Sequence, residues 1–304
     1  MTLQNDAPPL KAWLLLLLLA LIWGSSFILI KKGLLGFSPD QLAAIRIASA
    51  GFVLLPFLTQ RFKTVQRHHI LKLICVGLVG SFIPAFLFAF AQTKLPSGVT
   101  GVLNTFTPLA TLIIGVLIFK QLVSVRQWTG VLVGLAGTII LVTANANGDF
   151  AFNSYALFII AATICYGLNL NLIKHHISDL SALTITGVSL FLVAPPALIY
   201  LLFATPFVEQ VATDSSSHFA LAAILVLGVI GTAMALVIFN TVVKMTDTTF
   251  TSSVTYLIPI VALILGVIDG EPFLIEHAIG MAAILTGVFI ANKRARKTKV
   301  ILPS

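Results

Sequence analysis

Small polar side chains recur along one side of an apolar stretch at residues 97–119, SGVTGVLNTFTPLATLIIGVLIF. Thr100, Asn104 and Thr107 are spaced by four and three residues, so a helix places them on one face. Pro108 inside that helix would remove the hydrogen bond to the carbonyl of Asn104. A free carbonyl beside an amide, away from water, must be satisfied by protein, water or solute. This pattern indicates solute recognition.

Residues 248–270 repeat the pattern 151 positions further along the chain. Pro259 takes the place of the first proline, and it would free the carbonyl of Thr255 in the same way. Thr251 lies one turn before Thr255. We therefore predict two proline kinks, with Asn104 facing Thr255. The alternative is that the hydroxyls bond within their own helices and the prolines only bend them for packing.

An aromatic and a polar residue occur three positions apart in two other apolar stretches. Trp23 precedes Ser26, and 143 residues later Tyr166 precedes Asn169. Residues three apart share a helix face, so each helix presents an aromatic ring beside a hydrogen-bonding group. This combination favours an amphipathic organic solute, although each aromatic residue could equally be an ordinary packing residue.

Arg46 is the one clearly intramembrane charge in the predicted helices. Such residues usually mark a substrate path, a gate or a buried ion pair. We predict a role in gating or in binding a negative charge, and the alternative is that its side chain reaches outward to the interface. Asp269, Glu271 and Glu276 are the candidate partners.

The composition is that of a membrane protein. Of 304 residues, 58% are hydrophobic and 9% are charged, and the mean hydropathy is +1.06, whereas soluble domains carry about 25% charged residues. The net charge of +8 is spread over short loops, so we expect no nucleic-acid partner. Cys75 and Cys165 lack metal-binding spacing, and we predict neither a metal nor a cofactor.

Ten windows are long and apolar enough to cross a bilayer. They are residues 12–30, 40–59, 70–90, 98–119, 127–144, 152–173, 181–203, 219–241, 248–268 and 274–292. We interpret the longest connection, 204–218, as a plain hydrophilic tether. With the N-terminus in the cytoplasm, fourteen Lys and Arg residues fall on the cytoplasmic side and three outside. This bias predicts a multi-pass cell (inner) membrane protein with both termini cytoplasmic.

The chain is predicted to consist of two related halves. Gly77 and Gly80 match Gly228 and Gly231 at an offset of 151. We place a first five-helix repeat at 12–144, a second at 152–292, and a basic cytoplasmic tail at 293–304. Because five is odd, the second repeat enters the membrane from the opposite side. Inverted repeats are typical of secondary transporters that bind solute near the midplane.

The sequence resembles the drug/metabolite transporter superfamily, in particular its EamA-type members with ten helices. The resemblance rests on WGSSF at 23–27, SGVTGVLNTFTPL at 97–109, the Pro259 segment with Gly270-Glu271-Pro272, and two glycine-rich helices. One departure is that the first half has Lys120-Gln121 where the family often has Gly-Glu. The resemblance implies transport of amino acids, nucleobases, sugar derivatives or other small metabolites.

We therefore interpret the chain as an all-α integral membrane protein and a secondary transporter working by alternating access. The solute is expected to be a small organic metabolite, amino-acid-like or similarly amphipathic, with export favoured. The alternatives are a membrane-embedded enzyme acting on a lipid-like substrate and a non-transporting sensor or scaffold. The expected partners are the metabolite and the lipid bilayer, and the protein is a monomer or homodimer. The predicted substrate-binding residues are Trp23, Ser26, Thr100, Asn104, Tyr166, Asn169, Thr251 and Thr255.

Overall fold

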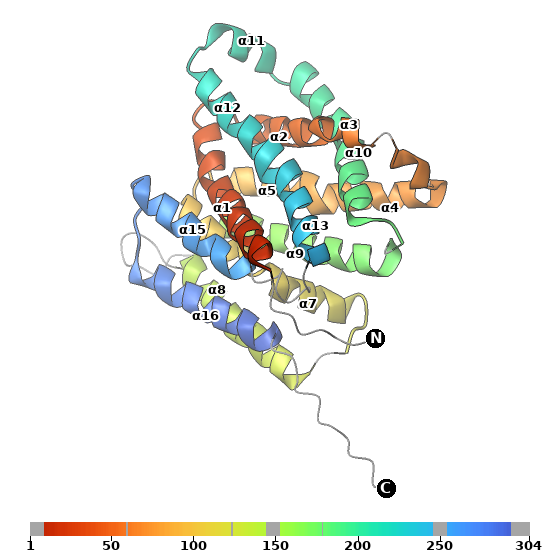
Figure 1. Cartoon of the computed structure of the whole chain (residues 1–304). Helices are drawn as coiled ribbons and strands as arrows, with labels where there is room; N and C mark the ends of the chain where they lie inside the picture. Colours follow the sequence, from red (N-terminus) through yellow and green to blue (C-terminus); the bar gives the residue numbers. More distant parts are fainter. Residues whose placement is uncertain are drawn as a thin grey trace.

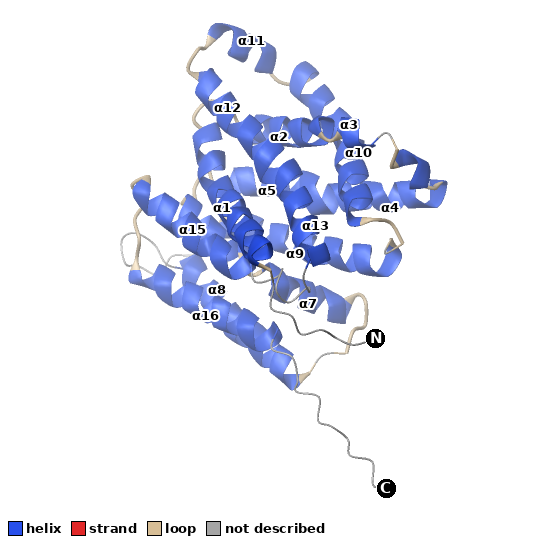
Figure 2. Cartoon of the chain, in the orientation of Figure 1, coloured by secondary structure: helices blue, strands red, loops and turns tan. Residues whose placement is uncertain are grey.

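The computed structural model describes residues 9–58, 60–122, 124–143, 153–177, 179–245 and 254–292. These residues form helices and loops, with no strand among them (Figure 2). Six helical stretches are long and apolar enough to cross a membrane, and shorter apolar helices accompany them. The predicted all-α membrane class is thereby confirmed.

Residues 10–143 form the helices of the first half of the chain, and residues 156–292 form those of the second half. In chain order they are α1 (Leu10–Gly33), α2 (Pro39–Val53), α3 (Leu55–Leu58), the 3₁₀ turn η1 (Phe62–Thr64), α4 (Arg67–Gly77), the π-helical η2 (Leu78–Phe82), α5 (Ile83–Ala91), α6 (Ser97–Asn104), α7 (Thr107–Leu117) and α8 (Val125–Thr143), then α9 (Ala156–His176), α10 (Ala182–Phe203), α11 (Phe207–Thr213), α12 (Ser217–Gly228), the π-helical η3 (Val229–Met234), α13 (Ala235–Met245), α15 (Val254–Ile268) and α16 (Ile275–Asn292).

The stretch 98–119, predicted as one helix, is divided into α6 and α7. Two turn residues separate them, and Pro108 lies at the start of α7, where a missing N–H costs least. The hydroxyl of Thr107 donates to the carbonyl of Asn104 at 2.8 Å, so the carbonyl that Pro108 cannot bond has a partner. Pro259, in contrast, lies inside α15.

Two π-helical segments, η2 and η3, interrupt the helices at matched places 151 residues apart. The wider turn is visible in Thr232, whose hydroxyl donates to the carbonyl of Leu227, five residues back, at 3.1 Å. Pro84 follows η2 and cannot donate to the carbonyl of Gly80. Such π bulges occur frequently at functional sites.

The segment 204–218 is not the plain tether that we predicted, because it contains the helix α11. Gln210 donates from its side chain to the carbonyl of Gly36, and it accepts from Gln41 at 3.1 Å. The ring of Phe207 lies 5.9 Å from that of Phe37. These contacts hold the segment against the connection between α1 and α2, and composition alone does not reveal them.

Glycines permit the closest helix contacts, as is common where lipid removes the hydrophobic drive for helix association. Figure 1 shows α8 and α16 side by side at the lower edge of the bundle, and they are in extensive contact. A Cβ atom on Gly287 would lie 2.5 Å from the carbonyl oxygen of Gly130, and one on Gly137 would lie 2.7 Å from that of Gly280. The glycines of these two helices therefore serve their close packing.

We expect Gly287→Ala to lower the apparent unfolding temperature, because its new methyl group meets rigid backbone and must push α8 and α16 apart. The cost is about 1–3 kcal/mol, as for other overpacked interiors. Gly134→Ala is the matched control on the same helix pair, since its methyl group meets the end of the flexible Leu109 side chain. Thermal unfolding in detergent measures both, and an equal loss in the two variants would contradict this interpretation.

Candidate functional site

The two π-helical segments each lie against a polar side chain from the other half of the chain. A Cβ atom on Gly80 of η2 would lie 2.7 Å from Nδ2 of Asn169 on α9. A Cβ atom on Gly231 of η3 would lie 3.1 Å from Oγ of Ser26 on α1. The structure thus brings two predicted site residues, Ser26 and Asn169, to equivalent places beside unusual backbone.

Asn169 carries an unfilled hydrogen-bonding group. Its Oδ1 atom is buried and has no hydrogen-bond partner. A buried acceptor without a donor costs free energy and calls for an explanation, such as a bound molecule. Thus the side chain is available to accept from a solute that carries an N–H or O–H group.

Aromatic rings flank these polar groups in two equivalent pairs. The ring of Trp23 lies 5.6 Å from that of Phe239, and the ring of Tyr166 lies 6.1 Å from that of Phe88. Phe239 follows Phe88 by 151 residues, the spacing that also separates the π-helical segments. Trp23 and Tyr166 lie one turn before Ser26 and Asn169 on the same helix faces.

Arg46, on α2, reaches this group of residues from a partly buried position. Its Nε donates to the hydroxyl of Thr232 in η3 at 3.2 Å, and Tyr166 lies within electrostatic range of its guanidinium. Within the described part of the chain, no carboxylate lies within 4.0 Å of its guanidinium. A cation in that position, without a counter-charge, is suited to an anionic group.

Thr100, a predicted substrate-binding residue on α6, is tightly packed. Its side chain is fully buried, and its hydroxyl donates to the carbonyl of Pro96 at 3.0 Å. This is the bonding within a single helix that we considered as the alternative. Thr107 likewise donates to a nearby backbone carbonyl, that of Asn104 at the end of α6. A role for Thr100 in binding solute stays a prediction.

The register between α6 and α15 differs from the predicted pairing of Asn104 with Thr255. A Cβ atom on Gly101 would lie 2.4 Å from the Cβ of Ala262. Because the two helices are antiparallel, Asn104 lies level with Pro259, about one turn from Thr255. Asn104 and Thr255 are both partly buried. The predicted residue Thr251 lies outside the described residues.

Charged side chains gather at the end of the bundle that carries Glu271, which we call the Glu271 end. Lys31 pairs with Asp269 at 2.6 Å and with Glu271 at 2.9 Å, and Lys32 also pairs with Asp269. The backbone N–H groups of Ser97 and Gly98, at the start of α6, donate to Glu271 at 2.9 and 3.0 Å. Asp269 and Glu271 therefore bind lysines, and the prediction that they accompany Arg46 is wrong.

Glu271 should make stability at the Glu271 end depend on pH. Burial raises the pKa of its carboxyl, but bonds from Gly98, Ser97 and Lys31 outweigh burial and hold the pKa below its ordinary value of 4.5. Its stabilisation is therefore complete above pH 4.5 and is lost as the pH falls through the lowered value. We expect Glu271→Gln to flatten the acid side of the unfolding profile. The exposed Glu209→Gln is the control, and identical slopes in both variants would contradict this assignment.

The opposite end, which we call the Arg61 end, holds a histidine cluster. His68, His69 and Asp179 have ligand atoms within 4.8 Å of one another. However, Nδ1 of His69 accepts from the N–H of Gln66 at 3.1 Å, and its Nε2 bonds Asp179 at 2.8 Å. A metal at Nε2 would require the other tautomer and the loss of this helix cap. We therefore interpret the cluster as a joint between α4 and the loop before α10.

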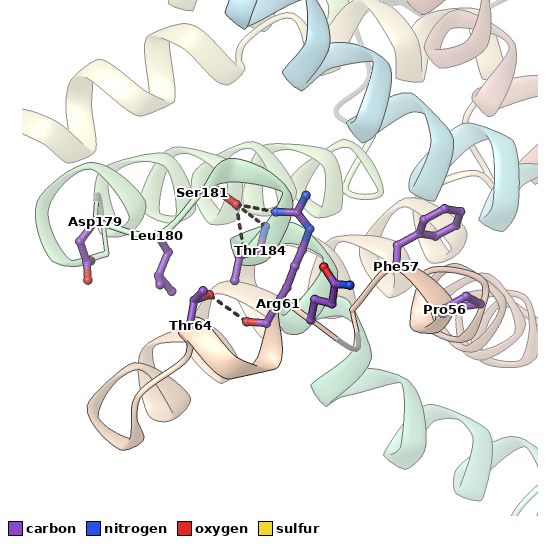
Figure 3. Close-up of a pocket in the computed structure, with 9 residues that line it drawn as sticks. Pro56, Phe57, Arg61, Thr64, Asp179, Leu180, Ser181 and Thr184 are labelled. Carbon is purple, nitrogen blue, oxygen red and sulfur yellow. Dashed lines mark hydrogen bonds between the residues drawn. The ribbon is translucent and has the colours of Figure 1, made fainter.

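A pocket also lies at the Arg61 end, between α3 and the start of α10 (Figure 3). We call Arg46, Thr232, Trp23, Ser26, Tyr166 and Asn169 the group around Arg46. None of the residues that line the pocket belongs to this group, which lies on α1, α2, α9 and η3 and against η2. It is thus a separate feature of the molecule.

Two stretches of the chain, residues 10–143 and 153–293, each match the model of the EamA-like transporter family. The matches together cover most of the chain, and they include every element that builds the site. The chain belongs to the EamA-like transporter family. It is accordingly a membrane transporter and not an enzyme, which confirms the predicted family and class.

Several curated proteins are similar to this chain. The uncharacterized inner membrane transporter YedA of Escherichia coli (strain K12) is 25% identical over 261 residues, covering 82% of this chain and 79% of that protein. A probable amino-acid metabolite efflux pump of Salmonella typhimurium (strain LT2) is 29% identical over 154 residues, half of each protein. A solved structure described only as "Crystal structure of protein" shares the fold, with a TM-score of 0.62, 19% identity, and 93% and 96% of the two chains covered.

Sequence reasoning about this EamA-family chain missed the partners that place the functional side chains. It did not name Thr232 as the partner of Arg46, nor the contact of Gly80 with Asn169. A signal was present, since Gly80 and Gly231 match at the offset of 151. Matched glycines of this kind indicate places of close approach between helices as well as a duplication.

Proposed function

We propose that this chain is a secondary transporter that exports a small amphipathic metabolite with a carboxylate group, such as an amino-acid-like solute. The observation that carries this proposal is the group around Arg46. A guanidinium without a counter-charge, the unfilled acceptor of Asn169 and the rings of Trp23 and Tyr166 come from both halves of the chain. A relative described as a probable amino-acid metabolite efflux pump supports the choice of solute.

In this proposal, the carboxylate of the solute binds Arg46, and its amino group donates to Oδ1 of Asn169. Tyr166 lies one turn from Asn169 on α9 and within electrostatic range of Arg46, so one solute could contact both Asn169 and Arg46. Charge-assisted bonds of this kind are the stronger class of hydrogen bond. Asn104, Thr255 and the remaining predicted residues stay candidates for further contacts.

Alternating access would follow from two inverted five-helix repeats, 12–144 and 152–292, with ten spans in all and a basic tail at 293–304. The two family matches, the paired π-helical segments and the paired aromatic contacts support this organisation. The excess of Lys and Arg supports a cytoplasmic Arg61 end and two cytoplasmic termini. Two similar halves facing opposite ways can exchange conformations at nearly equal free energy.

Solute exchange in vesicles containing the purified protein tests the proposal, with a panel of amino acids and their carboxyl-amidated analogues. We expect Asn169→Leu to weaken apparent affinity about tenfold, which corresponds to the loss of one hydrogen bond to a charged group. The control is Leu170→Ala, a substitution at the exposed residue next to Asn169. The proposal fails if no solute in the panel moves, or if both variants transport like the wild type.

A further inference from the structure

The pocket in Figure 3 has a volume of about 620 Å³ and lies between the end of α3, the turn η1 and the start of α10. This volume is within the range of about 300–1,000 Å³ that is usual for small-molecule sites. Its polar lining residues are Gln60, Arg61, Thr64, Asp179, Ser181 and Thr184, and its apolar ones are Pro56, Phe57 and Leu180.

Arg61 gives the pocket a positive charge that the neighbouring acid does not neutralise. Its Nη1 donates to the hydroxyl of Ser181 at 3.2 Å, which leaves further guanidinium N–H groups available. Asp179 lines the same pocket, but its carboxylate bonds His69 at 2.8 Å, and Figure 3 shows it away from the guanidinium. Throughout the described ranges, no carboxylate lies within 4.0 Å of Arg61.

The apolar side of the pocket continues into exposed apolar surface. Phe57 is 66% exposed, and Phe52, five residues earlier near the end of α2, is 36% exposed. The pocket therefore lies where surface suited to lipid meets a basic connection that includes Arg61 and Lys63. At such a boundary, basic side chains meet the phosphate groups of lipids and of soluble cytoplasmic anions.

We propose that this pocket binds a phosphate-bearing anion, with Arg61 as the principal ligand and the hydroxyl of Thr184 as a further donor. The oxygen of Ser181 accepts from Arg61 and from the Thr184 N–H, so its own proton goes to Oγ1 of Thr184. A guanidinium matches phosphate oxygens in a two-pronged geometry. The phosphate can belong to the headgroup of an anionic phospholipid or to a soluble phosphate ester. The occupant would bridge η1, in the first family match, and α10, in the second, so it would restrain movement between them.

The test is thermal unfolding and binding of the full chain with two probes. One probe is phosphatidylglycerol, added to phosphatidylcholine nanodiscs, and the other is sn-glycerol 3-phosphate, titrated into nanodiscs of phosphatidylcholine alone. We expect saturable stabilisation by at least one probe, because a ligand of the folded state raises the unfolding temperature. Stabilisation by the lipid alone identifies the headgroup, and stabilisation by the soluble ester identifies a free phosphate.

Variants assign the binding to the pocket. Arg61→Gln should weaken it about tenfold, and Gln60→Glu should weaken it without altering Arg61. Lys63→Gln, an exposed neighbour outside the lining, should change it less than about twofold, as expected for a screened surface charge. The proposal is overturned if neither probe stabilises the wild type, or if Lys63→Gln and Arg61→Gln weaken binding equally.

Discussion

Arg46→Gln is expected to lower transport about 100-fold while leaving a folded protein. The guanidinium is a cation that no described carboxylate neutralises, and its Nε is held by Thr232 at 3.2 Å. A charge-assisted hydrogen bond contributes about 1.5–3 kcal/mol, and a two-pronged bond to a carboxylate supplies two of them. Glutamine can still bond Thr232 but offers no charge. Initial rates of solute exchange in vesicles measure the loss.

Two comparisons separate solute binding by Arg46 from a purely structural role. Arg46→Lys keeps the charge without the planar fork, so it should recover part of the activity. A carboxyl-amidated solute should compete poorly in the wild type, and Arg46→Gln should no longer discriminate against it. If Arg46→Gln instead lowers stability and retains wild-type preference for the carboxylate, the residue supports the fold only.

The membrane class was predictable from composition because a chain with so few charges cannot present a soluble surface. The divided fourth span and helix α11 were not predictable from hydropathy. An apolar window looks the same whether its helix continues or stops, and the stop at residues 105–106 depends on Thr107 replacing a lost backbone donor. Likewise, α11 is held by bonds of Gln210 to distant residues.

The candidate site was predictable in its residue types and less so in its contacts. The spacing of Trp23, Ser26, Tyr166 and Asn169 predicted polar and aromatic groups on shared faces, and the structure places these four residues around the π-helical segments. The partners of Arg46 were predicted wrongly because the acids at the Glu271 end pair with lysines at the end of α1. Sequence spacing within helices is reliable, whereas pairing between helices depends on their register.

Gln121→Glu is expected to destabilise the Arg61 end, although the second half of the chain has a glutamate, Glu271, at the matching position. Asn171 is 3% exposed, and its Nδ2 donates to the carbonyls of Thr111 and Gly167 at 3.0 and 2.9 Å. Its Oδ1 must therefore face Gln121, whose Nε2 donates to it at 2.9 Å. A carboxylate cannot donate, so two acceptors would meet. We expect a loss of about 1–3 kcal/mol in thermal unfolding.

The same geometry explains why the first half departs from the Gly-Glu pattern while keeping its backbone turn. Lys120 and Gly270 both have positive φ, 54° and 81°. The N–H groups of Gln121 and Glu271 bond the carbonyls of Gly115 and Gly266, six and five residues back, at 3.0 and 2.9 Å. Both turns thus close on a glycine at the matching place, with one more residue in the first, and the side chain differs because of what it faces.

Introducing Gln121→Glu into a variant that already carries Asn171→Ile tests this explanation. Isoleucine is chosen because the corresponding residue of the first helix is Ile28. Without the Asn171 acceptor, the new carboxylate has no opposing oxygen there, and His175, now 3.0 Å from the Gln121 amide, can donate to it when protonated. We expect Gln121→Glu to cost about 1–2 kcal/mol less in this background, a coupling typical of residues in direct contact. An equal cost in both backgrounds would mean that Asn171 does not select the amide, and the glutamine would then need another explanation.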